Sequence, residues 1–407
     1  MTSSAAKDSN TDSGKGCAAD MDTPENDIHD GAQQQGARPP RKITQDDTAY
    51  AIVRMHRSPA SARLRSMSPK KPAADSPPAA PVLDKILVAI KDPRAQRLPA
   101  LRKAAQLAKA SGARLELFHA IADTVLVEAL DARRVSLEAY TAERLQAVLK
   151  ELQRLAKRLR KHDLEVECCA EWDYPPAEAI VRRALRTKAD LIVAERHAGR
   201  AVARWMLSYT DWELLRQAPC PVLLVKLPRA YHRPVVLTAV DPFHEHAKPA
   251  QLDAALLQQS ARLATAMQGS LRIVHCVAPS LIITAGWTGG PIVVDPGRNT
   301  ALLQRARQAL VAEVARHPLP SHKLALLEGS AREAVPQAAK DMGASIVVMG
   351  AVSRSGLQRL LIGNTAEAIL DALPCDALIV KPRGFRSKVA RRPRGAQLMA
   401  LPAAMTA

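Results

Sequence analysis

The sequence is poor in aromatic residues and contains no long apolar run. Aromatic side chains make up 3% of the 407 residues, whereas 47% of the residues are hydrophobic. The core must therefore be built from Leu, Val, Ile and Ala, which suits helices packed on a Val/Ile-rich sheet and disfavours a β-sandwich. No run of 18 apolar residues occurs, so we expect no transmembrane helix and no membrane partner. The first 30 residues are polar and acidic and lack the apolar segment of a secretory signal, so we expect a cytoplasmic protein.

The six cysteines also lack any arrangement typical of a metal site or a disulfide framework. No CxxC pair occurs, and no histidine lies at metal-ligand spacing from a cysteine. Cys168 and Cys169 fall in a predicted strand, where successive side chains point to opposite faces. This usage fits a reducing compartment, and we predict no metal site.

The net charge of +18 is spread along the chain. Residues 82–226 carry 26 basic and 19 acidic side chains, and residues 382–407 carry 6 basic and no acidic ones. A dedicated nucleic-acid surface usually concentrates its charge and adds aromatic residues for stacking. We therefore expect only non-specific, salt-sensitive contact with nucleic acids. The bases between Lys150 and Lys161 are interpreted as the solvated face of a helix.

A regular pattern begins near residue 82. Residues 1–81 are rich in Ser, Pro, Gln, Asp and Gly, which predicts a disordered N-terminal extension. From there, short apolar runs alternate with amphipathic segments, which predicts an α/β fold with a doubly wound parallel sheet. The predicted strands of this half are residues 85–90, 114–119, 164–169, 190–194 and 221–225. The predicted helices are residues 96–110, 138–162, 176–187 and 211–217.

The same order of elements then recurs. Strands are predicted at residues 234–240, 271–277, 323–327, 345–349 and 377–380, with helices at 250–268, 300–316, 331–342 and 365–373. A shift of 155 residues aligns residues 190–226 with 345–381 without a gap, which indicates a duplication. We predict domains at residues 82–228 and 229–383, a disordered basic tail at 384–407, and a pseudo-dimer of the two domains that meets at the fifth strand of each.

Chemistry-bearing residues follow two strands of the second repeat. Ligands of a doubly wound sheet bind at the carboxyl ends of its strands, where the strand order reverses. Asp241 follows the first strand and could accept a hydrogen bond from a ribose or a base. Gly350 opens a loop that ends at Gly363-Asn364-Thr365, directly before a helix. Glycines let a backbone approach a phosphate, and a helix start offers free N–H groups. Two alternatives remain open, a helix-capping box at Asn364 and a simple turn at Asp241.

The spacing Gly350-x2-Ser353-x9-Gly363-Asn364-Thr365 resembles the ATP-binding signature G-x2-G-x9-G-[S/T] of the universal stress protein family. The resemblance covers residues 82–383 and implies two tandem Rossmann-like domains, each with a five-stranded parallel sheet. It also implies ATP as a ligand, with the aspartate on adenine and the glycine loop on the phosphates. The implied cofactor-binding residues are Asp241, Gly350, Ser353, Gly363, Asn364 and Thr365.

This chain departs from the family signature in both repeats. Ser353 stands in place of the middle glycine, and Asn364 in place of the usual Ser or Thr. In the first repeat, Glu195, Ala198 and Ser208 occupy the three glycine positions. A carboxylate there would repel a phosphate, so we expect no ATP site in that half.

The resemblance implies a stress-response protein that acts by binding, with an adenine nucleotide as a regulatory ligand, and we expect a protein partner or self-association. No nucleophile, base and orienting residue occur at recognisable spacing, so we predict no catalytic residues and at most weak ATPase activity. Two alternatives remain, a slow nucleotide hydrolase of the same α/β class and a nucleic-acid-associated stress protein.

Overall fold

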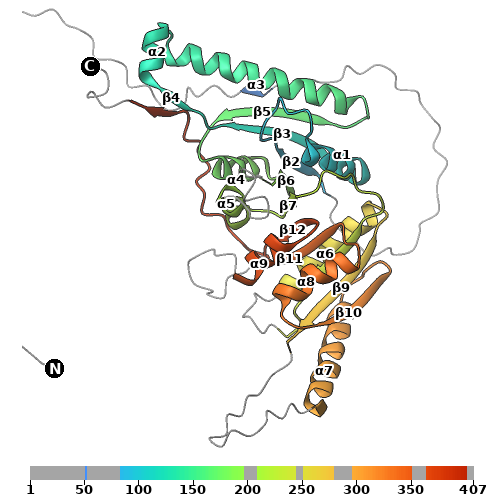
Figure 1. Cartoon of the computed structure of the whole chain (residues 1–407). Coiled ribbons are helices and arrows are strands. Elements are labelled where there is room, and N and C mark those ends of the chain that lie inside the picture. Colours follow the sequence, from blue (N-terminus) through green and yellow to red (C-terminus); the bar gives the residue numbers. More distant parts are fainter. Residues whose placement is uncertain are drawn as a thin grey trace, which may run out of the picture. The chain divides into compact units, whose positions relative to one another are not determined.

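One sheet runs through both repeats. The computed structural model of the chain describes residues 51–52, 83–196, 209–243, 251–278, 296–350 and 364–400. All of them belong to one structural unit, Thr48–Ala407. The sheet has 11 strands in the order β1-β5-β3-β2-β6-β7-β12-β11-β8-β9-β10 (Figure 1). Neighbouring strands are parallel within each repeat, as the alternation of strands and helices predicts.

The first repeat has the elements that the sequence predicts, with small shifts at their ends. Its five parallel strands are β2 Lys85–Ala89, β3 Arg114–Ile121, β5 Val166–Trp172, β6 Leu191–Glu195 and β7 Val222–Val225. Its predicted helices are α1 Pro99–Ser111, α3 Leu137–Arg160, α4 Pro176–Thr187 and α5 Tyr209–Gln217. A short strand and a short helix that the sequence did not predict precede α3, namely β4 Thr124–Leu126 and α2 Val127–Arg133.

The second repeat has the same order of elements. Its strands are β8 Val235–Ala239, β9 Ser270–Val277, β10 His322–Glu328, β11 Ile346–Gly350 and β12 Asp376–Val380. Its helices are α6 Leu252–Ala266, α7 Pro296–Ala315, α8 Ala331–Asp341 and α9 Asn364–Ala372.

Helices cover both faces of the sheet, which explains why its strands are apolar without alternation. Val88 belongs to a core shared with α1, α3, α6 and α7, whereas Leu87 belongs to a second core shared with α4, α5, α8 and α9. Cys168 and Cys169 likewise divide between the two cores, as their adjacency predicts. Burial raises the pKa of the Cys168 thiol to about 11, so this thiol stays protonated.

The two repeats meet through β7 and β12, which pair antiparallel. Leu223 pairs with Leu378, and these two residues are related by the same 155-residue shift that aligns the repeats. Val222 pairs with Ile379 and Leu224 pairs with Ala377, so exchanging the two repeats reproduces the same register. An internal two-fold axis therefore passes through the Leu223–Leu378 pair, and the predicted pseudo-dimer is confirmed.

Buried polar contacts stabilise this junction between the two repeats. Asp376, fully buried at the start of β12, is ion-paired with Lys103 of α1 and accepts a hydrogen bond from the Tyr231 hydroxyl at 2.5 Å. Its second oxygen accepts the backbone N–H groups of Lys226 and Leu227 at 2.9 and 3.1 Å. One carboxylate thus holds α1 of the first repeat, the connection between the repeats and β12 together.

The C-terminal residues correct one prediction. We expected residues 384–407 to be a disordered tail, but residues 397–399 form β13, Gln397–Met399, which pairs parallel with β4. The Arg394 backbone N–H donates to Asp173 at 3.0 Å, and its guanidinium lies 2.8 Å from Glu178. One base of the tail, Arg394, therefore meets a carboxylate of the first repeat, and β13 pairs along the edge of β4. Residues 401–407 lie outside the described residues.

Most of the predicted N-terminal extension lies outside the described residues. Its residues Ala51–Ile52 form the short strand β1, which pairs antiparallel with β5. Among the described residues, none of the helices has the length and apolar character needed to cross a bilayer.

Candidate functional site

Asp241 and Gly350 lie where the strand order reverses in the second repeat. β8 pairs with β9 on one side and with β11 on the other, so the order turns between β8 and β11. Asp241 follows the carboxyl end of β8, and Gly350 ends β11. The structure therefore brings these two predicted site residues to neighbouring carboxyl ends, the place where open α/β sheets bind ligands.

Asp241 has one carboxylate oxygen that is buried and lacks a hydrogen-bond partner among the described residues, Oδ1. Its backbone N–H donates to the Asp253 carboxylate at 3.1 Å, and Asp253 is itself buried in the first turn of α6. A buried acceptor left without a donor costs about 1–3 kcal/mol. Oδ1 is therefore suited to accept a hydrogen bond from a ligand.

The nearest aspartate of the first repeat, Asp92, lies one residue further along than Asp241 and is engaged differently. Asp92 Oδ1 accepts the backbone N–H of Arg94 at 2.9 Å, which closes a local turn. The two aspartates thus differ in the structure. The loop of the first repeat satisfies its own aspartate oxygen, whereas in the second repeat one aspartate oxygen has no donor among the residues that the structure describes.

Gly350 packs closely against α6, and a side chain there would force Leu252 to shift. A Cβ atom added there would lie 2.6 Å from Leu252 Cδ2, in the first turn of α6. The absence of a side chain is thus explained without a ligand, because it allows α6 to approach the end of β11. In the first repeat Glu195 pairs with Val225, just as Gly350 pairs with Val380 in the second repeat. The Glu195 carboxylate therefore occupies the position that corresponds to Gly350.

A histidine recurs at this edge in both repeats. His275 is buried, and its Nδ1 donates to the carbonyl oxygen of Val240 at 3.1 Å. His119 makes the same contact with Ile90 at 2.8 Å. A carbonyl oxygen only accepts, so Nδ1 carries the proton and each ring joins the second strand of its repeat to the end of the first. Burial lowers the pKa of His119, which keeps that ring neutral. Aligning the two repeats could have revealed this pair.

The remaining predicted residues fall at the start of α9 or outside the described residues. Asn364 is the exposed first residue of α9, and Thr365 is half-buried beside it. Ser353 and Gly363 lie outside the described residues. Glu367, the acidic member of the predicted capping box, accepts a contact from Arg216 of the first repeat at 3.2 Å. Within the described ranges, no group of three or more His, Cys, Asp or Glu side chains is arranged to hold a metal ion.

Comparison with known proteins identifies the family behind this geometry. A match to the universal stress protein family covers residues 83–226 and 235–381, which include all ten parallel strands of the two repeats. The chain belongs to the universal stress protein family. Its two matched segments are tandem domains of that family.

Relatives of this universal stress protein include proteins of the same two-domain length. It is 27% identical over 316 residues to universal stress protein E of Photorhabdus laumondii, covering 74% of this chain and 96% of the relative. It is 26% identical over 309 residues to universal stress protein E of Escherichia coli K12, with the same two coverages, 74% and 96%.

Solved structures show the same tandem arrangement. A putative universal stress protein from Pseudomonas aeruginosa superimposes with a TM-score of 0.57 at 25% identity, covering 74% of this chain and 94% of that one. A universal stress protein from Archaeoglobus fulgidus shares the fold with a TM-score of 0.51 at 16% identity, covering 74% of this chain and 98% of that one.

Proposed function

We propose that this universal stress protein acts in the cytoplasm by binding, with an adenine nucleotide as a regulatory ligand of its second domain. The observation that carries the proposal is Asp241 Oδ1, a buried acceptor at the reversal of strand order that has no donor within the described part of the chain. An adenine amino group or a ribose hydroxyl is a donor of the required kind. The names of the relatives support a role in the stress response.

The nucleotide would occupy one site per chain. In the first domain, Asp92 already holds its own loop, and Glu195 would face the phosphates. In the second domain, Gly350 leaves the end of β11 without a side chain, and the start of α9 would hold the phosphates through its N–H groups. The two domains would thus divide into a binding half and a half that supports the fold.

Paired aspartate variants test the site. In Asp241→Asn, an amide NH2 group replaces one oxygen and the charge is lost, so ATP affinity measured by calorimetry should fall about 10- to 100-fold. Asp92→Asn makes the same change in the first domain and should alter the affinity by less than about twofold. Two sites per chain, or greater sensitivity at Asp92 than at Asp241, would contradict the proposal.

A second pair tests the phosphate loop in the same measurement. Gly363→Val adds a branched side chain at the start of α9 and should abolish binding, because the backbone could no longer approach a phosphate. Ser208→Val, at the equivalent position of the first domain, should have no effect. Both positions lie outside the described residues, so circular dichroism must first show that each variant folds.

The proposal is for binding without conventional turnover. A protein partner or self-association would transmit the nucleotide-bound state. If the wild type releases phosphate from ATP and Asp241→Asn does not, the nucleotide hydrolase would be favoured instead. Affinity for nucleic acid that depends on sequence would favour the nucleic-acid-associated alternative, since non-specific electrostatic binding is independent of sequence.

A further inference from the structure

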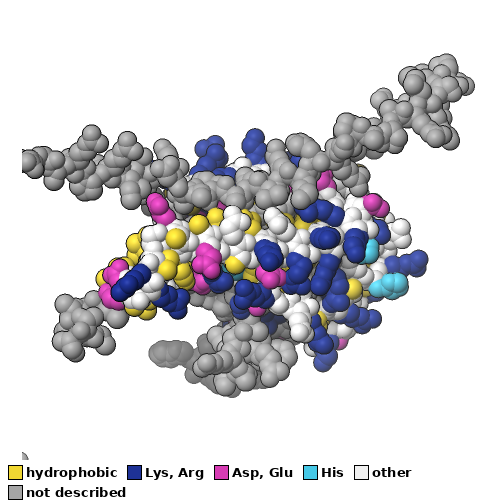
Figure 2. Space-filling view, turned by 90° about the horizontal axis from the view of Figure 1, so that it is seen from above, with side chains coloured by type: hydrophobic (Ala, Val, Ile, Leu, Met, Phe, Trp, Pro, Cys, Tyr) yellow, Lys and Arg dark blue, Asp and Glu magenta, His cyan; other side chains and the backbone are white. Residues whose placement is uncertain are grey.

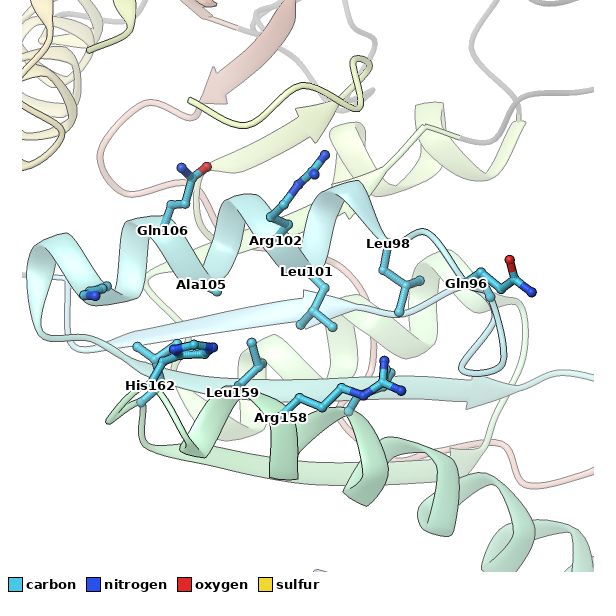
Figure 3. Close-up of a pocket in the computed structure, with 13 residues that line it drawn as sticks. Gln96, Leu98, Leu101, Arg102, Ala105, Gln106, Arg158, Leu159 and His162 are labelled. Atoms are coloured by element: carbon cyan, nitrogen blue, oxygen red, sulfur yellow. The ribbon is translucent and has the colours of Figure 1, made fainter. Parts of the chain in front are cut away.

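A pocket lies in the first domain, between α1 and the C-terminal end of α3 (Figure 3). Its volume is about 510 Å³, within the range typical of sites for small organic ligands. Leu98 and Leu101 point from the α1 side toward α3, and Leu159 points back from α3. Other apolar side chains complete the floor, namely Ala95, Ala105, Leu155 and Leu164.

Basic side chains border this apolar floor. Arg102 and Lys109 of α1 line the pocket together with Arg158 of α3 and His162, which follows that helix. Arg158 and His162 border the α3 side in Figure 3, whereas Arg102 extends from the opposite side of α1. No acidic side chain lines the pocket within the part of the chain that the structure describes. The space-filling view shows Lys and Arg gathered on the surface that includes α3 (Figure 2).

The four basic side chains are exposed, and within the described part of the chain none of them forms an ion pair or a side-chain hydrogen bond. The polar groups of Gln106, by contrast, are already used, because its amide both donates to and accepts from the backbone of Tyr231 at 3.0 Å. The cations therefore remain available to an anion, and the Leu and Ala side chains of the floor offer no donors or acceptors for a base or a peptide. The Gln96 amide is a further polar side chain of the lining.

The second domain provides an internal comparison. An alignment of the ends of α3 and α7 places Leu310 on Leu155, Val314 on Leu159 and His317 on His162, because the backbone N–H of His162 donates to Leu159 at 2.9 Å and that of His317 to Val314 at 3.1 Å. It also places Glu313 on Arg158. Glu313 lies 2.8 Å from the Arg316 guanidinium and 3.3 Å from the His317 ring. The second domain thus has a negative charge where the first has that of Arg158, and neighbouring basic side chains neutralise it. The basic border is a property of the first domain and not of the shared fold.

We propose that this pocket binds an amphipathic anion of the fatty-acid class. The acyl chain would lie on the Leu and Ala floor between α1 and α3, and the carboxylate would contact Arg158 and His162 at the border. Charge complementarity selects the anionic head, and the floor selects an unbranched apolar chain over a nucleotide. The first domain, which departs from the family's nucleotide signature, thereby has a ligand site of its own.

A fluorescent fatty acid, 11-(dansylamino)undecanoic acid, tests the proposal on the full chain. Saturable binding is expected, and dodecanoate should displace the probe about tenfold better than dodecanol, which has the same chain without the charge. Failure of the probe to bind saturably, or equal competition by the two molecules, would overturn the proposal.

Variants locate the site. Arg158→Glu reproduces the residue found in the second domain and should weaken probe binding at least about tenfold. Lys157→Glu makes the same charge change at an exposed neighbour that does not line the pocket, and should change affinity less than about twofold. Ala105→Phe fills the floor and should abolish binding while the protein remains folded by circular dichroism. Wild-type affinity in both Arg158→Glu and Ala105→Phe would place the probe elsewhere.

This inference does not depend on the nucleotide proposal. Asp241→Asn should bind the fatty-acid probe as the wild type does, and saturating ATP should not displace it. Displacement of the probe by ATP would mean that both ligands use one site, which would overturn the assignment to α1 and α3.

Discussion

At the residue scale, two lysines related by the 155-residue shift cross the junction between the domains. Lys226, after β7, donates to the carbonyl oxygens of Leu370 and Leu373 at the end of α9, at 2.8 and 2.6 Å. Lys381, after β12, donates to the carbonyl oxygen of Arg216 in the last turn of α5 at 3.0 Å. Each lysine thus caps the C-terminal end of a helix in the other domain, where a cation also interacts favourably with the helix dipole.

These lysines give the protein a predicted pH dependence. Burial lowers the pKa of Lys226 and of Lys381 to about 8, whereas an unfolded lysine has a pKa of about 10.4. Between these values the folded state binds fewer protons than the unfolded state, so stability should rise with pH through this window. The stability that deprotonation of the two lysines contributes is fully present above the pKa of the unfolded state and is lost as the pH falls through 8.

Urea unfolding between pH 7 and 9 measures this effect. The free energy of unfolding of the wild type should rise more steeply with pH than that of the double variant Lys226→Met/Lys381→Met. Other titrating groups contribute equally to both proteins, so the difference in slope reports the two lysines. Parallel curves would show that neither lysine loses its proton in the folded protein.

At the scale of elements, the C-terminal segment is held by a few polar contacts and one short strand pairing. Arg394 reaches Asp173 and Glu178, and β13 adds to β4. The segment crosses from the end of the second domain to the first, and Leu398 and Met399 remain about half exposed. It buries little apolar surface, so its attachment should be of low local stability.

Reversing one charge should detach this segment. Arg394→Glu would place two carboxylates against each other at Glu178, and amide exchange at Gln397–Met399 should accelerate while the melting temperature of the core stays unchanged. Arg391→Glu, an exposed arginine of the same segment, serves as the matched control and should leave the exchange rates as they are. Equal exchange in both variants would show that the strand pairing alone holds the tail.

At the scale of the whole molecule, the buried pair of Asp376 and Lys103 joins the domains through side chains that are almost fully inaccessible. Removing one partner leaves the other charge buried and uncompensated. Asp376→Ala should therefore lower the free energy of unfolding by about 3–5 kcal/mol.

An exposed pair supplies the control for that loss. Asp84 and Arg114 lie 2.6 Å apart with side chains 73% and 42% exposed, so Asp84→Ala should cost less than about 1 kcal/mol. Urea denaturation of both variants decides the comparison. A similar loss in the two would mean that the buried pair contributes no more to the junction than a surface pair does.

Most of the architecture was predictable because it depends on local patterns. A strand buried on both faces is apolar throughout, and a helix with one buried face repeats its apolar residues every three to four positions. The helix Pro176–Thr187 therefore has the predicted bounds, and the duplication predicted that β7 and β12 would meet. The short elements β4, α2 and β13 were missed, because three to seven residues carry too little periodicity.

The sequence by itself determined the fold class, the duplication and which residues lie at the carboxyl ends of the strands. Only the tertiary structure decided how those residues are used. It left Asp241 with a buried oxygen, assigned Gly350 to packing against Leu252, and enclosed a pocket between α1 and the end of α3. Each of these features depends on contacts between segments far apart in the chain. Periodicity reports which face of an element is buried, but not which atom of a distant element lies against it.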